Sequence, residues 1–175
     1  MCVFERLDSR KRTGGQSYPK PSKHLVLVLA PHGGGIVILG MVEGAAAEIV
    51  PWLSERKVFG ETRLMEKSHI QLELGNMYAK LQSLRLLLRH VADLLDRNIP
   101  APTETATLKL LASELAITSS RSMLQMYGWR GIDNDYPIQK RFRDAQQTTI
   151  FEGSSEILKL KLCGEFVGKL RGAVR

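Results

Sequence analysis

The most regular pattern of hydrophobic positions runs from Ile70 to Leu95. Apolar residues recur there with alternating spacings of four and three, at Ile70, Leu74, Met77, Leu81, Leu84, Leu88, Val91 and Leu95. This spacing aligns the side chains along one side of a helix, where another helix can pack against them. The pattern therefore predicts a core helix, which Asn98 and Pro100 are expected to end.

Less regular apolar patterns predict helices on both sides of this one. The first covers residues 36–54 and is rich in Gly and Ala, and Pro51 is expected to kink it or end it early. Gly60 is a plausible stop for this segment. The third helix covers residues 103–126, and a threonine, Thr103 or Thr105, is expected to cap it.

The last part of the chain predicts a short basic helix at residues 138–145 and a final helix from Ser154 to about Leu170. Ser as N-cap and Glu156 in the first turn favour a helix start there. No strand pattern is found after residue 35. The fold class is therefore all-α, an up-down bundle of four main helices with a short fifth helix.

Residues 1–34 do not fit the bundle pattern. Residues 1–24 are basic and rich in Ser, Gly and Pro, which predicts a flexible or extended tail. The apolar stretch 24–30 is too short to span a membrane and is either a strand or a buried helical end. Gly33-Gly34-Gly35 then predicts a linker. We thus expect a tail or linker over residues 1–34 and one helical domain over residues 35–175.

Composition narrows the classes of function. The formal net charge is +7, which suits a ligand that carries phosphate groups, but no nucleic-acid-binding motif accompanies it. The only cysteines, Cys2 and Cys163, are far apart, so neither a disulfide framework nor a cysteine metal site is expected, and a reducing compartment fits. The four histidines show no metal-ligand spacing, and we expect no metal.

Candidate chemistry lies at Glu152, immediately before the final helix. Ile150 and Phe151 precede this carboxylate and Gly153 follows it. An apolar setting raises the pKa of a carboxylate by desolvation, which suits a general base. A solvated glutamate, or one that caps a backbone N–H, is the alternative from these residues alone.

Three blocks in a fixed order carry a family resemblance: Tyr136-Pro137, Arg143-Asp144-Ala145 and TIFEGSSEI at residues 149–157. Together they resemble the C-terminal signature of the acyl-CoA dehydrogenases, usually Tyr-Glu-Gly-Thr-Ser-Glu-Ile. The resemblance implies that Glu152 is the catalytic base, that Phe151 and Gly153 line the substrate site, and that Ser154 and Glu156 contact the cofactor.

Two further motifs extend the resemblance over about residues 35–170. Glu55-Arg56-x-x-Phe59-Gly60 matches the family's Glu-Arg-x-x-Phe-Gly, which implies that Arg56 and Phe59 reach flavin adenine dinucleotide (FAD) bound by a neighbouring subunit. Gln125-x-x-Gly128-Trp129-x-Gly131 resembles Gln-x-x-Gly-Gly-x-Gly, which implies further contacts with FAD from Gln125 and Gly128. Trp129 replaces the family's second glycine.

The resemblance implies FAD-dependent α,β-dehydrogenation of an acyl-CoA thioester. Glu152 would remove the α-proton, and an electron-transfer flavoprotein or similar acceptor would reoxidise the flavin. A homodimer or homotetramer is implied, without nucleic acid and without a membrane span. The implied location is cytoplasmic in a bacterium and the mitochondrial matrix in a eukaryote.

The family's N-terminal helical domain and middle β domain have no counterpart in residues 1–34. We therefore expect residues 1–175 to be a C-terminal domain or truncated homologue that is catalytically silent alone. Two alternatives remain open: a non-catalytic oligomerisation or binding module derived from that domain, and an acyl-CoA oxidase on the same scaffold.

Overall fold

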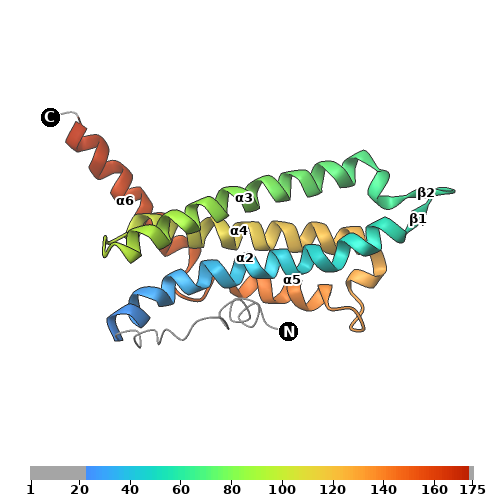
Figure 1. Ribbon diagram of the computed structural model, residues 1–175, viewed down its shortest axis with the longest axis horizontal. Coiled ribbons are helices and arrows are strands. Elements are labelled where there is room, and N and C mark those ends of the chain that lie inside the picture. Colours follow the sequence, from blue (N-terminus) through green and yellow to red (C-terminus); the bar gives the residue numbers. More distant parts are fainter. Residues whose placement is uncertain (1–22, 174–175) are drawn as a thin grey trace, which may run out of the picture.

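The computed structural model describes residues 23–173, with side chains from residue 34 onward. Figure 1 shows α2, α3, α4 and α5 side by side in an up-down arrangement, while α6 projects from one end. This arrangement confirms the all-α fold class. The described helices are α2 (Lys23–Glu55), α3 (Ser68–Asp96), α4 (Pro102–Tyr127), α5 (Ile138–Gln147) and α6 (Ser155–Ala173), with short 3₁₀ turns η2 (Leu64–Glu66) and η3 (Gly128–Gly131).

The core lies where α4 packs against α2, α3 and α5. The apolar seam predicted in α3 is confirmed, because Ile70, Leu81, Leu84 and Val91 are buried. The other seam residues are partly buried and pack against the same core: Leu74, Met77, Leu88 and Leu95. Asn98 ends α3 as expected, since it adopts a left-handed conformation with φ of 57°.

The prediction for residues 23–35 is corrected. The triple glycine is not a linker but lies inside α2, which runs without a break from Lys23 to Glu55. Glycine disfavours a helix, yet a Cβ on Gly35 would lie 3.0 Å from Cγ of Leu108. Close packing against α4 therefore outweighs the local preference. The predicted tail at residues 1–22 lies outside the described residues.

Pro51 does not end α2 early, because the helix continues to Glu55. By length and composition, residues Gly34–Glu55 are the one described segment that could cross a membrane. Ile38, Ile49 and Leu53 in this segment are nevertheless fully buried in the bundle. Burial of this kind is what a core helix of a helical bundle shows.

Two smaller predictions are wrong. A short antiparallel pair, β1 (Lys57–Val58) with β2 (Thr62–Arg63), follows α2, and Gly60 lies in its turn rather than at a helix end. At the start of α4 neither threonine is the cap, because Pro102 begins the helix and the Thr105 hydroxyl donates instead to the Ala101 carbonyl at 2.6 Å. Proline suits the first helical position, where no N–H is needed.

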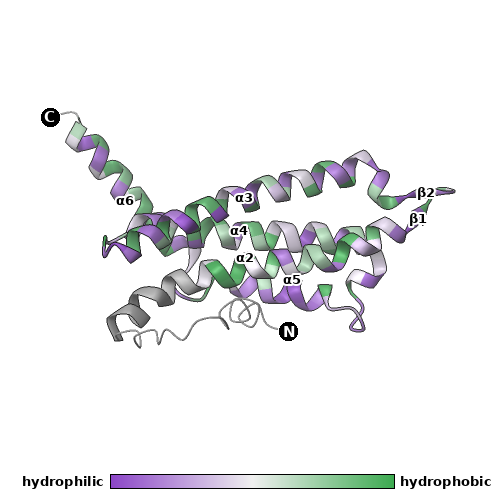
Figure 2. Ribbon diagram, in the orientation of Figure 1, coloured by the Kyte–Doolittle hydropathy of each residue, from purple (hydrophilic) through white to green (hydrophobic). Residues whose placement is uncertain are grey.

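Helix α6 differs from the expected fourth member of the bundle. It contacts α4 near its start and then leaves the bundle (Figure 1). Ser155 is its only residue that is buried in the described structure. Figure 2 shows apolar residues distributed around this helix, and its exposed apolar side chains are Ile157, Leu160, Phe166, Val167 and Leu170.

Candidate active site

A sharp turn carries Glu152 between α5 and α6. The backbone N–H groups of Ile150 and Phe151 donate to the carbonyl of Gln147, and Ser155 N–H donates to Thr149 O at 3.0 Å. Within this closure Glu152 has φ of 55° and Gly153 has φ of 100°. A non-glycine residue in the left-handed region costs free energy, so neighbouring contacts must stabilise it.

One of these contacts is with α2. The carboxylate of Glu152 lies against Gly34 and accepts a hydrogen bond from its backbone. A Cβ at position 34 would clash with carboxylate oxygen Oε2, and it would lie 3.4 Å from a ring carbon of Phe151. Because Gly34 has no side chain, the carboxylate of Glu152 can occupy the space beside α2.

The second contact comes from a buried lysine in α4. Lys109 is only 2% exposed, and its ammonium donates to the Gly153 carbonyl at 2.8 Å. The same ammonium lies 5.5 Å from the ring centroid of Phe151, within cation–π range. One turn along α4, the Ser113 hydroxyl bonds the Thr148 carbonyl at 2.9 Å. Helix α4 thus holds both ends of the segment that carries Glu152.

The electrostatics of Glu152 and Lys109 are coupled. Burial raises the pKa of Glu152, and the positive charge of Lys109 and the hydrogen bond from Gly34 oppose the rise. Burial lowers the pKa of Lys109, and the charges of Glu152 and Glu156 oppose that change. The net result for Glu152 is a carboxylate with raised proton affinity, as expected from its apolar neighbours.

The start of α6 follows the sequence prediction. The Ser154 hydroxyl accepts a hydrogen bond from Ile157 N–H at 3.5 Å, as an N-cap does. Hydrogen bonds from its own backbone N–H and from the Ser154 side chain lower the pKa of Glu156. Ser154 and Glu156 therefore lie beside Glu152, together with Phe151 and Gly153.

The other predicted site residues lie at the far end of the bundle. Arg56 and Phe59 belong to the end of α2 and the β1–β2 turn, which Figure 1 shows opposite α6. Gln125 and Gly128 lie at the end of α4 and are exposed, as are Arg56 and Phe59. The structure therefore divides the predicted residues into two groups and does not bring them together in one chain.

Aromatic rings organise this second group. The guanidinium of Arg130 lies 4.4 Å from the ring centroid of Trp52, and that of Arg56 lies 5.7 Å from it. Tyr127 contacts Trp52 with ring centroids 5.3 Å apart. Trp129, which replaces the family's second glycine, is 69% exposed. At this end of the molecule, two guanidinium groups therefore lie over the ring of Trp52.

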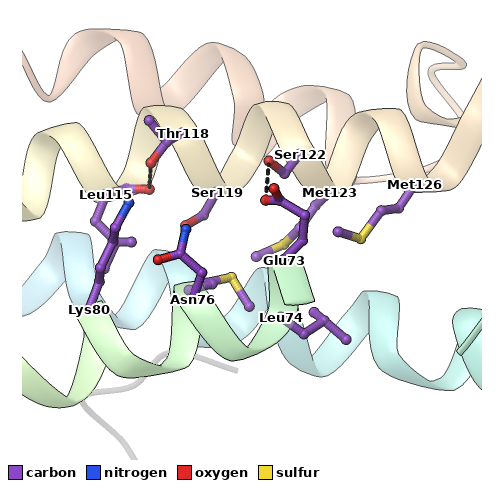
Figure 3. Close-up of a pocket in the computed structure, with 11 residues that line it drawn as sticks. Glu73, Leu74, Asn76, Lys80, Leu115, Thr118, Ser119, Ser122, Met123 and Met126 are labelled. Atoms are coloured by element: carbon purple, nitrogen blue, oxygen red, sulfur yellow. Dashed lines mark hydrogen bonds between the residues drawn. The ribbon is translucent and has the colours of Figure 1, made fainter. Parts of the chain in front are cut away.

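The cavities between α3 and α4 are separate from both groups. One has a volume of about 40 Å³, and Figure 3 shows the residues that line it. Among them, Glu73 accepts a hydrogen bond from the Ser122 hydroxyl at 3.2 Å. The volume of this cavity suits water rather than an organic ligand. A larger hollow of about 320 Å³ on the same pair of helices is mostly apolar and does not include Glu152.

Sequence reasoning missed three of these residues: Gly34, Lys109 and Arg130. The triple glycine that contains Gly34 indicates a linker from sequence alone. Lys109 lies on the buried side of α4, four residues before Ser113, but its partners Gly153 and Phe151 come from a distant segment. Arg130 likewise meets its aromatic partners only in the folded chain.

Comparison with known proteins identifies the family. The model of the acyl-CoA dehydrogenase C-terminal domain matches residues 33–165. The chain is 35% identical over 133 residues to the mitochondrial short-chain specific acyl-CoA dehydrogenase of Mus musculus, covering 76% of this chain and 32% of that one. It is 36% identical over 133 residues to the acryloyl-CoA reductase (NADH) of Anaerotignum propionicum, covering 76% and 34%.

The fold comparison agrees. The butyryl-CoA dehydrogenase of Megasphaera elsdenii superposes with a TM-score of 0.76 and 27% identity, over 81% of this chain and 37% of that one. The chain therefore spans about a third of the length of these relatives. With the matched domain model and the relatives' identity, the chain belongs to the acyl-CoA dehydrogenase family, in which it corresponds to the C-terminal helical domain.

Proposed function

We propose that this domain serves FAD-dependent α,β-dehydrogenation of an acyl-CoA thioester, with Glu152 as the base that takes the α-proton. The observation that carries the proposal is the setting of this carboxylate. It is held in a left-handed turn, against a helix glycine, with a raised pKa. Raised proton affinity helps a carboxylate to accept a proton from carbon at neutral pH.

The neighbouring residues have distinct proposed roles. Phe151 supplies an apolar wall beside the carboxylate, and Gly153 leaves room for substrate next to it. The backbone N–H of Glu152 is assigned to the thioester carbonyl, whose polarisation makes the α-proton acidic. FAD, when bound, would supply the acceptor for the hydrogen on the β-carbon, taken as a hydride.

The far end of the bundle fits the pyrophosphate of FAD. Arg56 and Arg130 bring two guanidinium groups to one surface, and arginine suits bidentate binding of phosphate oxygens. Gly128 has φ of 68° and open space where a side chain would stand. A phosphate can therefore approach its backbone closely. Phe59 and Gln125 are exposed on the same end and complete the proposed FAD contacts there. Ser154 and Glu156 would contact FAD at the Glu152 end of the bundle.

The separation of the two groups supports a shared site in an oligomer. One subunit would supply Glu152 to one active site and Arg56 with Phe59 to the site of a neighbour, in a homodimer or homotetramer. Such reciprocal sharing requires a symmetric assembly. The proposed electron acceptor is an electron-transfer flavoprotein or a similar carrier, in the bacterial cytoplasm or the mitochondrial matrix.

The test replaces Glu152 with Gln in a protein that joins this domain to the family's two other domains. The amide keeps the shape but cannot take the proton, so dehydrogenation should fall by about 10²–10⁴-fold or more. Flavin absorbance of the purified protein should stay unchanged, because Glu152 is not among the proposed FAD contacts. Retention of more than about a tenth of the activity would assign the base elsewhere.

The same preparation separates the alternatives. Oxygen consumption with acyl-CoA, without another acceptor, would indicate an acyl-CoA oxidase. Absence of both flavin and turnover in the joined protein would favour a non-catalytic oligomerisation module. Flavin reduction by an acyl-CoA, with the electrons passed to an artificial acceptor, is the result that supports a dehydrogenase.

A further inference from the structure

Lys109 is the most deeply buried charged residue among the described residues. Removing an ammonium group from water is costly, and lysine is rarely fully buried unless its charge is paired. Here the partners are specific: the Gly153 carbonyl at 2.8 Å and the face of the Phe151 ring at 5.5 Å from its centroid. Both partners flank Glu152 in the sequence.

Among the described side chains, the charged groups that act on Lys109 come from the same turn and the start of α6. Glu152 and Glu156 both favour the charged form of the lysine. Lys159 also lies on α6, but its ammonium pairs with Glu114 at 3.4 Å. Lys109 is therefore the cation that this structure places inside the turn, and Lys159 is a cation outside it.

The turn needs such a partner. Glu152 and Gly153 both have positive φ, a conformation that neighbouring contacts must stabilise, and the Gly153 carbonyl accepts its hydrogen bond from the Lys109 ammonium. Without the ammonium, the half-buried Gly153 carbonyl would lose this hydrogen bond, and the turn would lose one of the contacts that hold it.

We propose that Lys109 is a positioning residue for Glu152: its ammonium holds the Gly153 carbonyl, and this bond fixes the left-handed turn that presents the carboxylate to substrate. The turn is held whether or not Glu152 is the base, and only the catalytic consequence rests on the proposed function. The positioning role of Lys109 can therefore be tested without an activity assay. That role and the role of Glu152 as the base can each be rejected without rejecting the other.

The experiment measures opening of the turn with a protease that cleaves after glutamate. Cleavage after Glu152 is compared with cleavage after Glu61, an exposed residue of the β1–β2 turn at the other end of the same molecule. When cleavage is slower than closing, the rate reports the population of the open turn. The ratio of the two rates removes differences in protease activity.

Lys109→Met keeps a side chain of similar length but removes the donor and the charge. The Glu152 to Glu61 cleavage ratio should rise roughly tenfold or more, the factor that matches loss of one charge-assisted hydrogen bond. Lys109→Arg keeps the donor and the charge, so its cleavage ratio should stay near that of the unmodified protein. Lys159→Met, the matched control on the outer cation, should leave the ratio unchanged.

Two results would overturn the proposal. An unchanged ratio in Lys109→Met would show that the lysine only fills space. If the cleavage ratio of Lys109→Arg rises as much as that of Lys109→Met, the shape of the lysine side chain holds the turn and its hydrogen-bond donor does not.

A measurement on the unmodified protein covers the case in which Lys109→Met fails to fold. An ammonium held in a hydrogen bond exchanges its protons slowly, so ¹H–¹⁵N spectra at neutral pH should show a Lys109 side-chain signal close to the Phe151 ring protons. Rapid exchange of the Lys109 ammonium protons with water, like that of a surface lysine, would also reject the proposal that Lys109 positions Glu152.

Discussion

Gly34 shows how a single missing side chain shapes the proposed site. Its backbone approaches the carboxylate of Glu152 because no Cβ intervenes. In Gly34→Ala the flexible end of Glu152 should swing toward water. The pKa of Glu152 should then fall toward its ordinary value, since burial is the main cause of its rise.

A ¹³C titration of the Glu152 carboxyl group would measure this change. Gly75→Ala in α3 is the matched control, because a Cβ there meets open space. This control should leave the pKa of Glu152 unchanged and stabilise the fold by about 0.5–1 kcal/mol, the helix preference of alanine over glycine. An unchanged pKa in Gly34→Ala would mean that the carboxylate is not held against α2.

The raised pKa of Glu152 also predicts how stability depends on pH. The folded chain holds the proton of this carboxyl group more tightly than the unfolded chain, in which its pKa is near 4.5. Stability from this group is thus fully present below pH 4.5 and decreases as pH rises through the folded pKa. Glu152→Gln should therefore gain stability relative to the unmodified protein across that window.

Denaturant unfolding of both proteins at several pH values would test this prediction. The difference in free energy of unfolding should increase in favour of Glu152→Gln above pH 4.5 and then level off. A difference that is constant with pH, or one that favours the unmodified protein as pH rises, would contradict the raised pKa.

Along a single helix, the exposure of leucine side chains differs strongly between nearby positions, as α3 shows. Leu84 is 4% exposed, whereas Leu86 on the same helix is 65% exposed. Leu84→Ala should cost about 2–5 kcal/mol of unfolding free energy through lost burial and a cavity. Leu86→Ala should change it by no more than about 0.5 kcal/mol, the usual surface effect. Equal effects in denaturant unfolding would mean that the seam is not the core.

The elements differ in how well the sequence alone predicts them. Helix α3 was predicted almost completely because its apolar spacing depends only on the helical period. The triple glycine of α2 indicates a linker from sequence, whereas its helix depends on packing of Gly35 against Leu108 in a distant segment. The direction of α6 was not predictable either, since helical propensity does not say where a helix points.

In the candidate site, too, local sequence motifs are predictable and contacts with distant segments are not. The sequence indicates Glu152 as a candidate base because its neighbours in the chain match a family motif. Lys109 was overlooked because its partners, the Gly153 carbonyl and the Phe151 ring, are 44 and 42 residues away and meet it only after folding. Motifs that are continuous in sequence are thus predictable, and contacts that support them from another helix are not.

At the scale of the whole molecule, the described residues of α6 expose apolar side chains where this helix projects. Phe166 is 64% exposed and Leu160 is 70% exposed. Apolar side chains gathered on a projecting helix favour association. Together with the separation of Arg56 from Glu152, this predicts that the protein self-associates. Sedimentation at micromolar concentration should show a dimer or larger species, and a strictly monomeric protein would remove the argument for a shared site.

Helix α2 connects the two ends of the molecule as one uninterrupted element. Gly34 faces the Glu152 carboxylate near one end, and Arg56 follows the other end. Because each helical residue adds about 1.5 Å and 100° of rotation, the number of residues between them sets both distance and angular phase. Inserting one residue would turn Arg56 about 100° away from its present face, whereas exchanging side chains preserves the geometry. The length of this helix is therefore a tighter constraint on the proposed function than most of its residues.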